Sequence, residues 1–118
     1  MTKTVAPYGE WVSPITTDLF MQGARMLQEV NATSQGVSWL EGRPTEGGRS
    51  VLMHRSKDGK ANEVCPADWS VRTRVHEYGG GAFHAAENGF YGVNQKDQRV
   101  YALGDEPKAI TAPGARFA

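Results

Sequence analysis

The sequence has little cysteine, no excess of either charge and no long apolar run. Its 118 residues hold one cysteine, Cys65, so no disulfide can form within the chain, and this suits a reducing compartment. Thirteen basic and thirteen acidic residues cancel, which gives no electrostatic argument for binding nucleic acid or an anionic membrane. Residues 1–7 lack the apolar core of a signal peptide, and no stretch is long enough to span a bilayer. We therefore expect a soluble cytoplasmic protein with neither nucleic acid nor membrane as a partner.

Residue types that occur in metal and phosphate sites are present, but their spacing does not fit the known motifs. Glu77 follows His76, yet the second histidine that the zinc-protease helix requires is missing. His54 and His84 fall in strand patterns with no ligand spacing between them. The glycines at 79–81 are not followed by the Lys-Ser/Thr pair of a phosphate loop. We expect no metal and no cofactor.

Turn residues divide most of the chain into short strands. A helix start precedes them, because Ser13 suits the N-cap, Pro14 suits the first helical position, and Gly23 offers a stop after about two turns. Asp-Gly at 58–59 and Asn-Gly at 88–89 are typical of hairpin turns. The expected strands are 25–33 (ambiguous with a helix), 36–41, 50–55, 62–65, 81–85, 90–93, 99–103 and 108–111. Cys65 ends one of these patterns and is interpreted as a small buried apolar residue.

The strands form two similar sets of four. The third strands of the two sets begin at Val51 and Val100, 49 residues apart, and the fourth are centred on Val64 and Ile110, 46 residues apart. Four antiparallel strands repeating every roughly 40–50 residues are typical of β-propeller blades, although a plain antiparallel sandwich gives a similar pattern. Because a blade cannot bury both of its faces alone, we expect the chain to be the front end of something longer.

The fold class that we predict is all-β, with two four-stranded antiparallel blades of a truncated β-propeller after a short N-terminal helix. Trp11, Trp39 and Trp69 are interpreted as packing between blades and under the N-terminal segment. The expected boundaries are 1–24 for the N-terminal segment, 25–67 for the first blade, 68–80 for the connecting loop, 81–113 for the second blade and 114–118 for the start of a third.

The most informative segment is 71–81, which reads VRTRVHEYGGG. Three successive glycines are costly in backbone entropy and are kept where the backbone approaches something closely or needs unusual angles. Together with YGEWVSPIT at 8–16 and WLEGRP at 39–44, the part at 72–81 resembles the N-terminus of bacterial serine peptidases of the prolyl oligopeptidase family. The dipeptidyl aminopeptidase/acylaminoacyl peptidase-like subgroup is the most similar. The resemblance runs from about residue 8 to residue 118, with the three motifs in the same order and at similar spacing.

The resemblance implies a fold and a role. In that family an N-terminal β-propeller covers a C-terminal α/β-hydrolase domain with a Ser-Asp-His triad, limits access to short peptides and contributes substrate contacts. This chain would be the first two blades, and it holds no triad: the nearest match to Gly-x-Ser-x-Gly, at 32–36, lacks the first glycine and leads into a strand. We expect a non-catalytic part of a serine peptidase that hydrolyses short peptides, gating and positioning substrate for a hydrolase domain of the same polypeptide. The alternative is a stand-alone β-sheet binding module that self-associates into a ring.

The candidate substrate-binding residues are Arg72, Arg74, His76, Glu77 and Tyr78. On the functional interpretation they reach toward a substrate cavity, where Glu77 accepts hydrogen bonds from a peptide ammonium and an arginine holds a carboxylate or carbonyl. On the structural interpretation they form an internal cluster of ion pairs and hydrogen bonds that fixes the connection between blades. The sequence leaves both open and favours the structural one.

Overall fold

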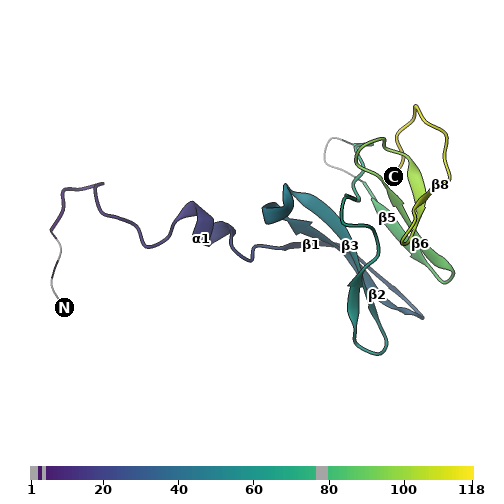
Figure 1. The fold of residues 1–118 in the computed structure, drawn as a ribbon, viewed down its shortest axis with the longest axis horizontal. Coiled ribbons are helices and arrows are strands. Elements are labelled where there is room, and N and C mark those ends of the chain that lie inside the picture. Colours follow the sequence, from purple (N-terminus) through teal and green to yellow (C-terminus); the bar gives the residue numbers. More distant parts are fainter. Residues whose placement is uncertain (1–2, 4, 77–79) are drawn as a thin grey trace.

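Two four-stranded antiparallel sheets make up most of the protein in the computed structural model, which describes residues 3, 5–76 and 80–118 (Figure 1). Each strand pairs with the next along the chain, so both sheets are simple meanders. This arrangement confirms the predicted fold class of two blades. The first sheet consists of β1 (Met26–Thr33), β2 (Gly36–Arg43), β3 (Arg49–Ser56) and β4 (Ala61–Glu63). The second consists of β5 (Phe83–Ala86), β6 (Gly89–Val93), β7 (Val100–Leu103) and β8 (Lys108–Ala109).

The hairpins form where the turn residues predict them. The β3–β4 turn contains the Asp-Gly pair, and Gly59 there has a φ of +85°, which a glycine adopts without strain. The β2–β3 pairing runs from Gly36 opposite Ser56 to the far ends of both strands. At Gly36 a Cβ atom would lie 2.2 Å from the carbonyl oxygen of Arg55, so this position requires glycine.

The two sheets share one hydrophobic core. Its buried members come from the first sheet, from the connection and from the start of the second blade: Leu40, Leu52, Cys65, Val71 and Ala82. Half-buried side chains of both sheets pack around them, among them Val64, Phe83, Phe90 and Leu103. Burial raises the pKa of the Cys65 thiol to about 12, so it stays protonated at neutral pH and acts as the buried apolar residue that was predicted.

Side-chain contacts also join the sheets outside this core. At the tips of the β1–β2 and β5–β6 hairpins, the Ser34 hydroxyl donates to the Glu87 carboxylate. The His54 ring lies 4.9 Å from the Phe90 ring. The first strands of the two sheets, β1 and β5, lie next to each other. The sheets therefore form a stacked pair, as neighbouring blades do.

The N-terminal segment extends away from the sheets (Figure 1). Its helix α1 spans Thr17–Met21, and the Oγ1 of Thr16 accepts a hydrogen bond of 3.1 Å from the backbone N–H of Leu19. The predicted start at Ser13 is wrong, because that hydroxyl instead accepts from the N–H of Ile15 in a local turn. A helix with no buried face gains nothing from packing, which explains why only one turn forms. No helix in the described part of the chain is long and apolar enough to cross a membrane.

The three tryptophans differ in their surroundings. Trp69 packs against the shared core and meets Tyr101 edge to face at 4.8 Å, as predicted for packing between blades. Trp11 is 68% exposed, and its indole donates to the carbonyl of Ala6, so the prediction that it packs under the N-terminal segment is wrong. Trp39 alternates with the core residue Leu40 along β2 and is half-buried on the opposite face of the sheet.

Candidate functional site

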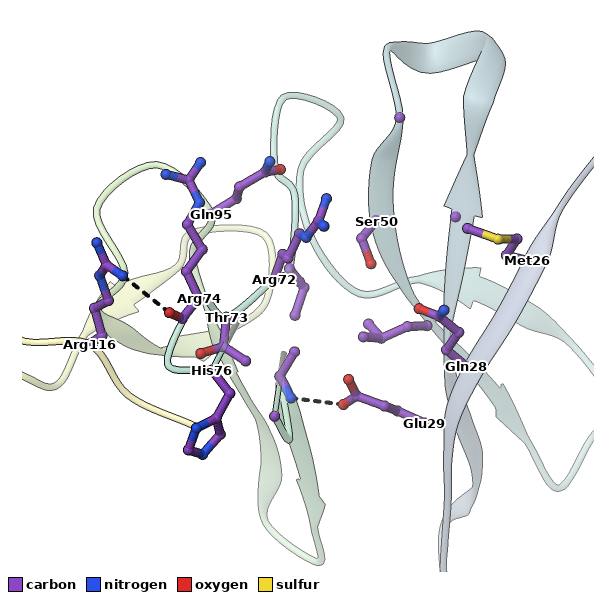
Figure 2. A pocket seen from close by; sticks show the side chains of 16 residues that line it. Met26, Gln28, Glu29, Ser50, Arg72, Thr73, Arg74, His76, Gln95 and Arg116 are labelled. Carbon is purple, nitrogen blue, oxygen red and sulfur yellow. Dashed lines mark hydrogen bonds between the residues drawn. The ribbon is translucent and has the colours of Figure 1, made fainter. Parts of the chain in front are cut away.

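A cavity of about 760 Å³ opens between the two sheets, near the start of β1 and the end of β2 (Figure 2). Its wall on the first sheet includes Met26, Gln28 and Glu29 of β1. The opposite wall comes from the segment that connects the sheets and from the C-terminal segment. Four of the residues on that side carry or can carry positive charge: Arg72, Arg74, His76 and Arg116.

Backbone hydrogen bonds hold the start of the 71–76 segment between the sheets. The N–H of Val71 donates to the carbonyl of Ser50 in β3 at 2.8 Å, and Val71 also forms a β-bridge with Asn94. The N–H of Arg72 donates to the carbonyl of Val93 in β6 at 3.0 Å. The segment thus acts as a short strand tied to both sheets, which fixes its side chains relative to the cavity.

Alternation along this strand separates Thr73 from the arginines on either side. Thr73 is 3% exposed, and its hydroxyl donates to the carbonyl of Phe117 and accepts from the N–H of Val75 at 3.2 Å. Arg72 and Arg74 are exposed to the cavity. The buried threonine therefore ties the C-terminal segment to the strand while both guanidinium groups stay accessible.

Gln98 fixes the backbone of the two arginines. Its side chain is buried, its Oε1 accepts from the N–H of Arg74 at 2.6 Å, and its Nε2 donates to the carbonyls of Arg72 and Gln95 at 3.2 and 3.0 Å. Gln98 also has a φ of +60°, in the left-handed region that non-glycine residues rarely adopt. Such strain persists only where the surrounding contacts hold it, and it concentrates at functional sites.

Glu29 supplies a carboxylate on the opposite wall. It lies in a one-residue β-bulge between Gln28 and Asn31 and has a φ of +50°. Its Oε2 accepts a hydrogen bond of 2.8 Å from the backbone N–H of Ala82, at the entry to β5 (Figure 2). The bulge thereby aims this side chain across the gap between the sheets.

The cavity brings together three of the five predicted site residues, Arg72, Arg74 and His76. The other two, Glu77 and Tyr78, lie outside the described residues. The hydrogen bonds of Thr73 and Gln98 match one part of the structural interpretation. The ion pairs that it also expects are not seen, because within residues 5–76 and 80–118 no carboxylate pairs with Arg72 or Arg74. A substrate-binding role for these residues stays a prediction.

The glycine run approaches its neighbours closely at one described position. A Cβ atom on Gly80 would lie 2.9 Å from the Cβ of Ala118, whereas one on Gly81 would meet nothing within 4 Å.

The sequence reasoning missed Glu29, Gln98 and Arg116. Arg116 reaches the cavity through contacts with residues more than 40 positions away, for example the 3.3 Å hydrogen bond from its Nη1 to the carbonyl of Arg74. No local pattern signals such a contact.

No family model and no curated protein matches the chain. Solved structures do match. A Mycobacterium tuberculosis puromycin-hydrolyzing peptidase is 34% identical with a TM-score of 0.72, over 92% of this chain and 18% of that one. A puromycin hydrolase is also 34% identical, with a TM-score of 0.76 over the same shares of the two chains. A mutant puromycin hydrolase complexed with PGG is 33% identical with a TM-score of 0.70, over 86% of this chain and 17% of that one.

The chain spans less than a fifth of the length of these peptidases. Identity above 30% together with the common two-sheet fold makes the likeness one of sequence as well as of architecture. The likeness in sequence and the likeness in architecture both agree with the family resemblance of the three motifs at 8–16, 39–44 and 72–81. The chain is similar in sequence and in fold to a part of these puromycin-hydrolysing peptidases, as an N-terminal propeller segment of the prolyl oligopeptidase family would be.

Proposed function

We propose that this segment gates and positions short peptides for an α/β-hydrolase domain of the same polypeptide. The observation that carries the proposal is the position of the 72–76 motif. Part of the sequence that carries the family resemblance lines the cavity between the blades. The volume of this cavity, about 760 Å³, lies within the usual range for small-ligand pockets. A cytoplasmic location, which suits the single cysteine, is part of the proposal.

The chemistry of the whole enzyme would be acyl transfer to an activated serine, with the developing oxyanion stabilised by hydrogen-bond donors. This segment would supply none of those groups. Its contribution would be binding and orientation, which turn a bimolecular encounter into a reaction within one complex.

The test uses the purified product of the complete reading frame and peptides of increasing length. We expect hydrolysis of aminoacyl and dipeptidyl p-nitroanilides and of peptides of a few residues, with kcat/KM falling steeply for longer chains. Residues 1–118 expressed alone should hydrolyse none of them. Equal cleavage of a denatured full-length protein substrate would overturn the gating role. A product without hydrolase activity would overturn the peptidase assignment.

Self-association of the chain is a second candidate, favoured by the apolar surface of β1. Met26, Leu27 and Val30 are 61%, 65% and 72% exposed on this edge strand. An exposed edge of this kind pairs readily with another chain. Light scattering on residues 1–118 separates the candidates: a stable closed multimer supports self-association, and a monomer excludes it.

A further inference from the structure

We infer that the cavity between the sheets binds the C-terminal carboxylate of a short peptide through Arg72, Arg74 and Arg116, with Gln98 as a positioning residue. The ligand class rests on the proposed function. The assignment of an anion to this wall rests on the contacts of the described residues alone. It goes beyond gating, because it states which end of the peptide faces this part of the propeller.

The first argument is that no carboxylate of the described residues pairs with these guanidinium groups. Within residues 5–76 and 80–118, Arg72 and Arg74 form no ion pair, and the one contact of Arg116 is with the neutral carbonyl of Arg74. Arginine is charged at any physiological pH, so three such groups lining one cavity repel each other unless an anion joins them. The lining therefore has an excess of positive charge that a ligand anion would balance.

The second argument concerns Glu29, the one carboxylate among the described lining residues. Its oxygen accepts the N–H of Ala82, and Figure 2 shows it on the β1 side, across the cavity from the labelled arginines. It therefore holds the two sheets together and does not neutralise the arginine wall. An incoming carboxylate meets no competing group of the described chain on that wall.

The third argument is preorganisation. The Gln98 side chain holds the backbone on both sides of Thr73 with two hydrogen bonds, to Arg72 and Arg74, and a third hydrogen bond to Gln95 anchors it in its own turn. The left-handed backbone of Gln98 lies in the β6–β7 turn, where its N–H donates to the carbonyl of Asn94 at 2.9 Å. A site whose backbone is already fixed loses less entropy on binding, which is how rigid sites gain affinity.

The fourth argument selects a peptide carboxylate rather than a small inorganic anion. Guanidinium groups bind carboxylates and phosphates alike through paired hydrogen bonds. In addition to the arginines, however, the lining includes the apolar side chain of Met26, which is 61% exposed on the opposite wall. Apolar lining favours a ligand with an apolar body next to its charge, as a peptide terminus has.

The experiment compares trialanine with its C-terminal amide, which lacks the negative charge. The complete protein is first treated with a serine-directed phosphonate, so that calorimetry reads binding apart from cleavage. We expect the wild type to bind trialanine at least about tenfold more tightly than the amide, because a charge-assisted hydrogen bond is worth about that factor. Arg74→Gln should remove this preference, and Arg55→Gln is the matched control. Arg55 is an exposed arginine of β3, outside the cavity lining, whose Nε donates to the carbonyl of Gly59 at 3.3 Å.

Each outcome decides the inference. Equal binding of the acid and the amide by the wild type overturns it, as does an unchanged preference in Arg74→Gln. Inorganic phosphate that binds more tightly than trialanine and displaces it makes the cavity a phosphate site instead. If Arg74→Gln does not fold, Arg74→Lys keeps the charge and should lose part of the preference, because lysine lacks the paired donors. A protein that hydrolyses nothing yet prefers the acid supports this site and overturns only the proposed function.

Discussion

Arg43 and Arg49 of the first sheet lie among carboxylates and are nearly covered by them, whereas Arg72 and Arg74 stand exposed over the cavity between the sheets. The Nε of Arg43 lies 2.8 Å from Glu41, and its Nη1 lies 3.1 Å from Glu46. Arg49 also forms an ion pair with Glu46, and its Nη2 lies 3.2 Å from the carboxylate of Glu63. The side chains of Arg43 and Arg49 are 13% and 12% exposed.

This difference separates a structural use of arginine from a binding use. Burial alone would lower the pKa of Arg43, but hydrogen bonds to Glu63, Glu41 and Glu46 outweigh it and raise the pKa. Three carboxylates take up the Nε and Nη1 donors of Arg43 and its Nη2 contacts the Sδ of Met53, so this guanidinium is held rigidly and offers little to a ligand. For Arg72 and Arg74 over the cavity the reverse holds: Gln98 fixes their backbones, and no carboxylate in the described part of the chain pairs with their guanidinium groups.

The structural cluster is the set of ion-paired residues Arg25, Arg43, Arg49, Glu41, Glu46 and Glu63. Replacing Glu41 breaks this cluster and has the largest expected effect. Glu41 is 4% exposed and accepts from both Arg25 and Arg43. We expect Glu41→Gln to lower the free energy of unfolding by about 2–3 kcal/mol, because buried hydrogen bonds between charged groups are lost. Urea unfolding of the complete protein measures this.

A control variant and a binding measurement make this a test of the difference between the two groups of arginines. Glu106→Gln, at an exposed glutamate of the β7–β8 turn, should change stability by less than about 0.5 kcal/mol. Trialanine binding should be the same in both variants, since neither residue lines the cavity. A Glu41→Gln protein with normal stability and weakened peptide binding would reverse the roles assigned to the two arginine groups.

Strand positions followed from the sequence because alternation and turn residues act locally. The Asp-Gly turn at 58–59, for example, fixes the β3–β4 hairpin. The start of helix α1 was misplaced because Ser13 and Thr16 are both good capping residues, and a segment without a buried face gives no further signal. The bulge at Glu29 was missed as well, since the contact that its carboxylate makes is with the N–H of Ala82, 53 residues along the chain at the entry to β5.

Of the residues that form the cavity, only those in the segment 72–76 could be predicted from the sequence. Arg72, Arg74 and His76 stand out as a cluster of ionisable residues before glycines. Gln98 and Arg116 come to the same place through hydrogen bonds to carbonyl and N–H groups far along the chain. Backbone groups are the same at every position, so the sequence holds no mark of such partners.

Removing the Gln98 side chain should have a medium effect and should act on the cavity rather than on the cluster. We expect Gln98→Ala to lower the free energy of unfolding by about 1–2 kcal/mol, because the buried N–H of Arg74 and carbonyl of Arg72 lose their partner. Trialanine binding should weaken severalfold as the two arginines lose their fixed spacing.

Gln98→Gly is the matched variant, since it removes the same amide but relaxes the left-handed backbone. It should be more stable than Gln98→Ala by about 1 kcal/mol and should bind trialanine equally weakly. If the two variants bind as well as the wild type, Gln98 supports only the fold. Chemical denaturation and calorimetry on the same samples give both readings.

Acidification should weaken the structural cluster by the smallest amount. A hydrogen bond from Arg49 lowers the pKa of Glu46, and one from Arg43 lowers the pKa of Glu63. In the unfolded chain both carboxyls return to an ordinary value near 4.5, so there they bind protons at a higher pH than in the folded protein. Their contribution to stability is therefore complete above that value and is lost as the pH falls below it.

Glu63→Gln removes one of these carboxylates, so the unfolding free energy should fall less steeply between about pH 5 and pH 3 than in the wild type. The pair is partly exposed, and the difference should be about 0.5–1 kcal/mol. Urea unfolding at several pH values measures it, with Glu106→Gln again as the control that keeps the wild-type slope. An identical slope in the Glu63→Gln protein would mean that solvent already screens this outer part of the cluster, and that Glu41 and Glu46 hold Arg43 in place without Glu63.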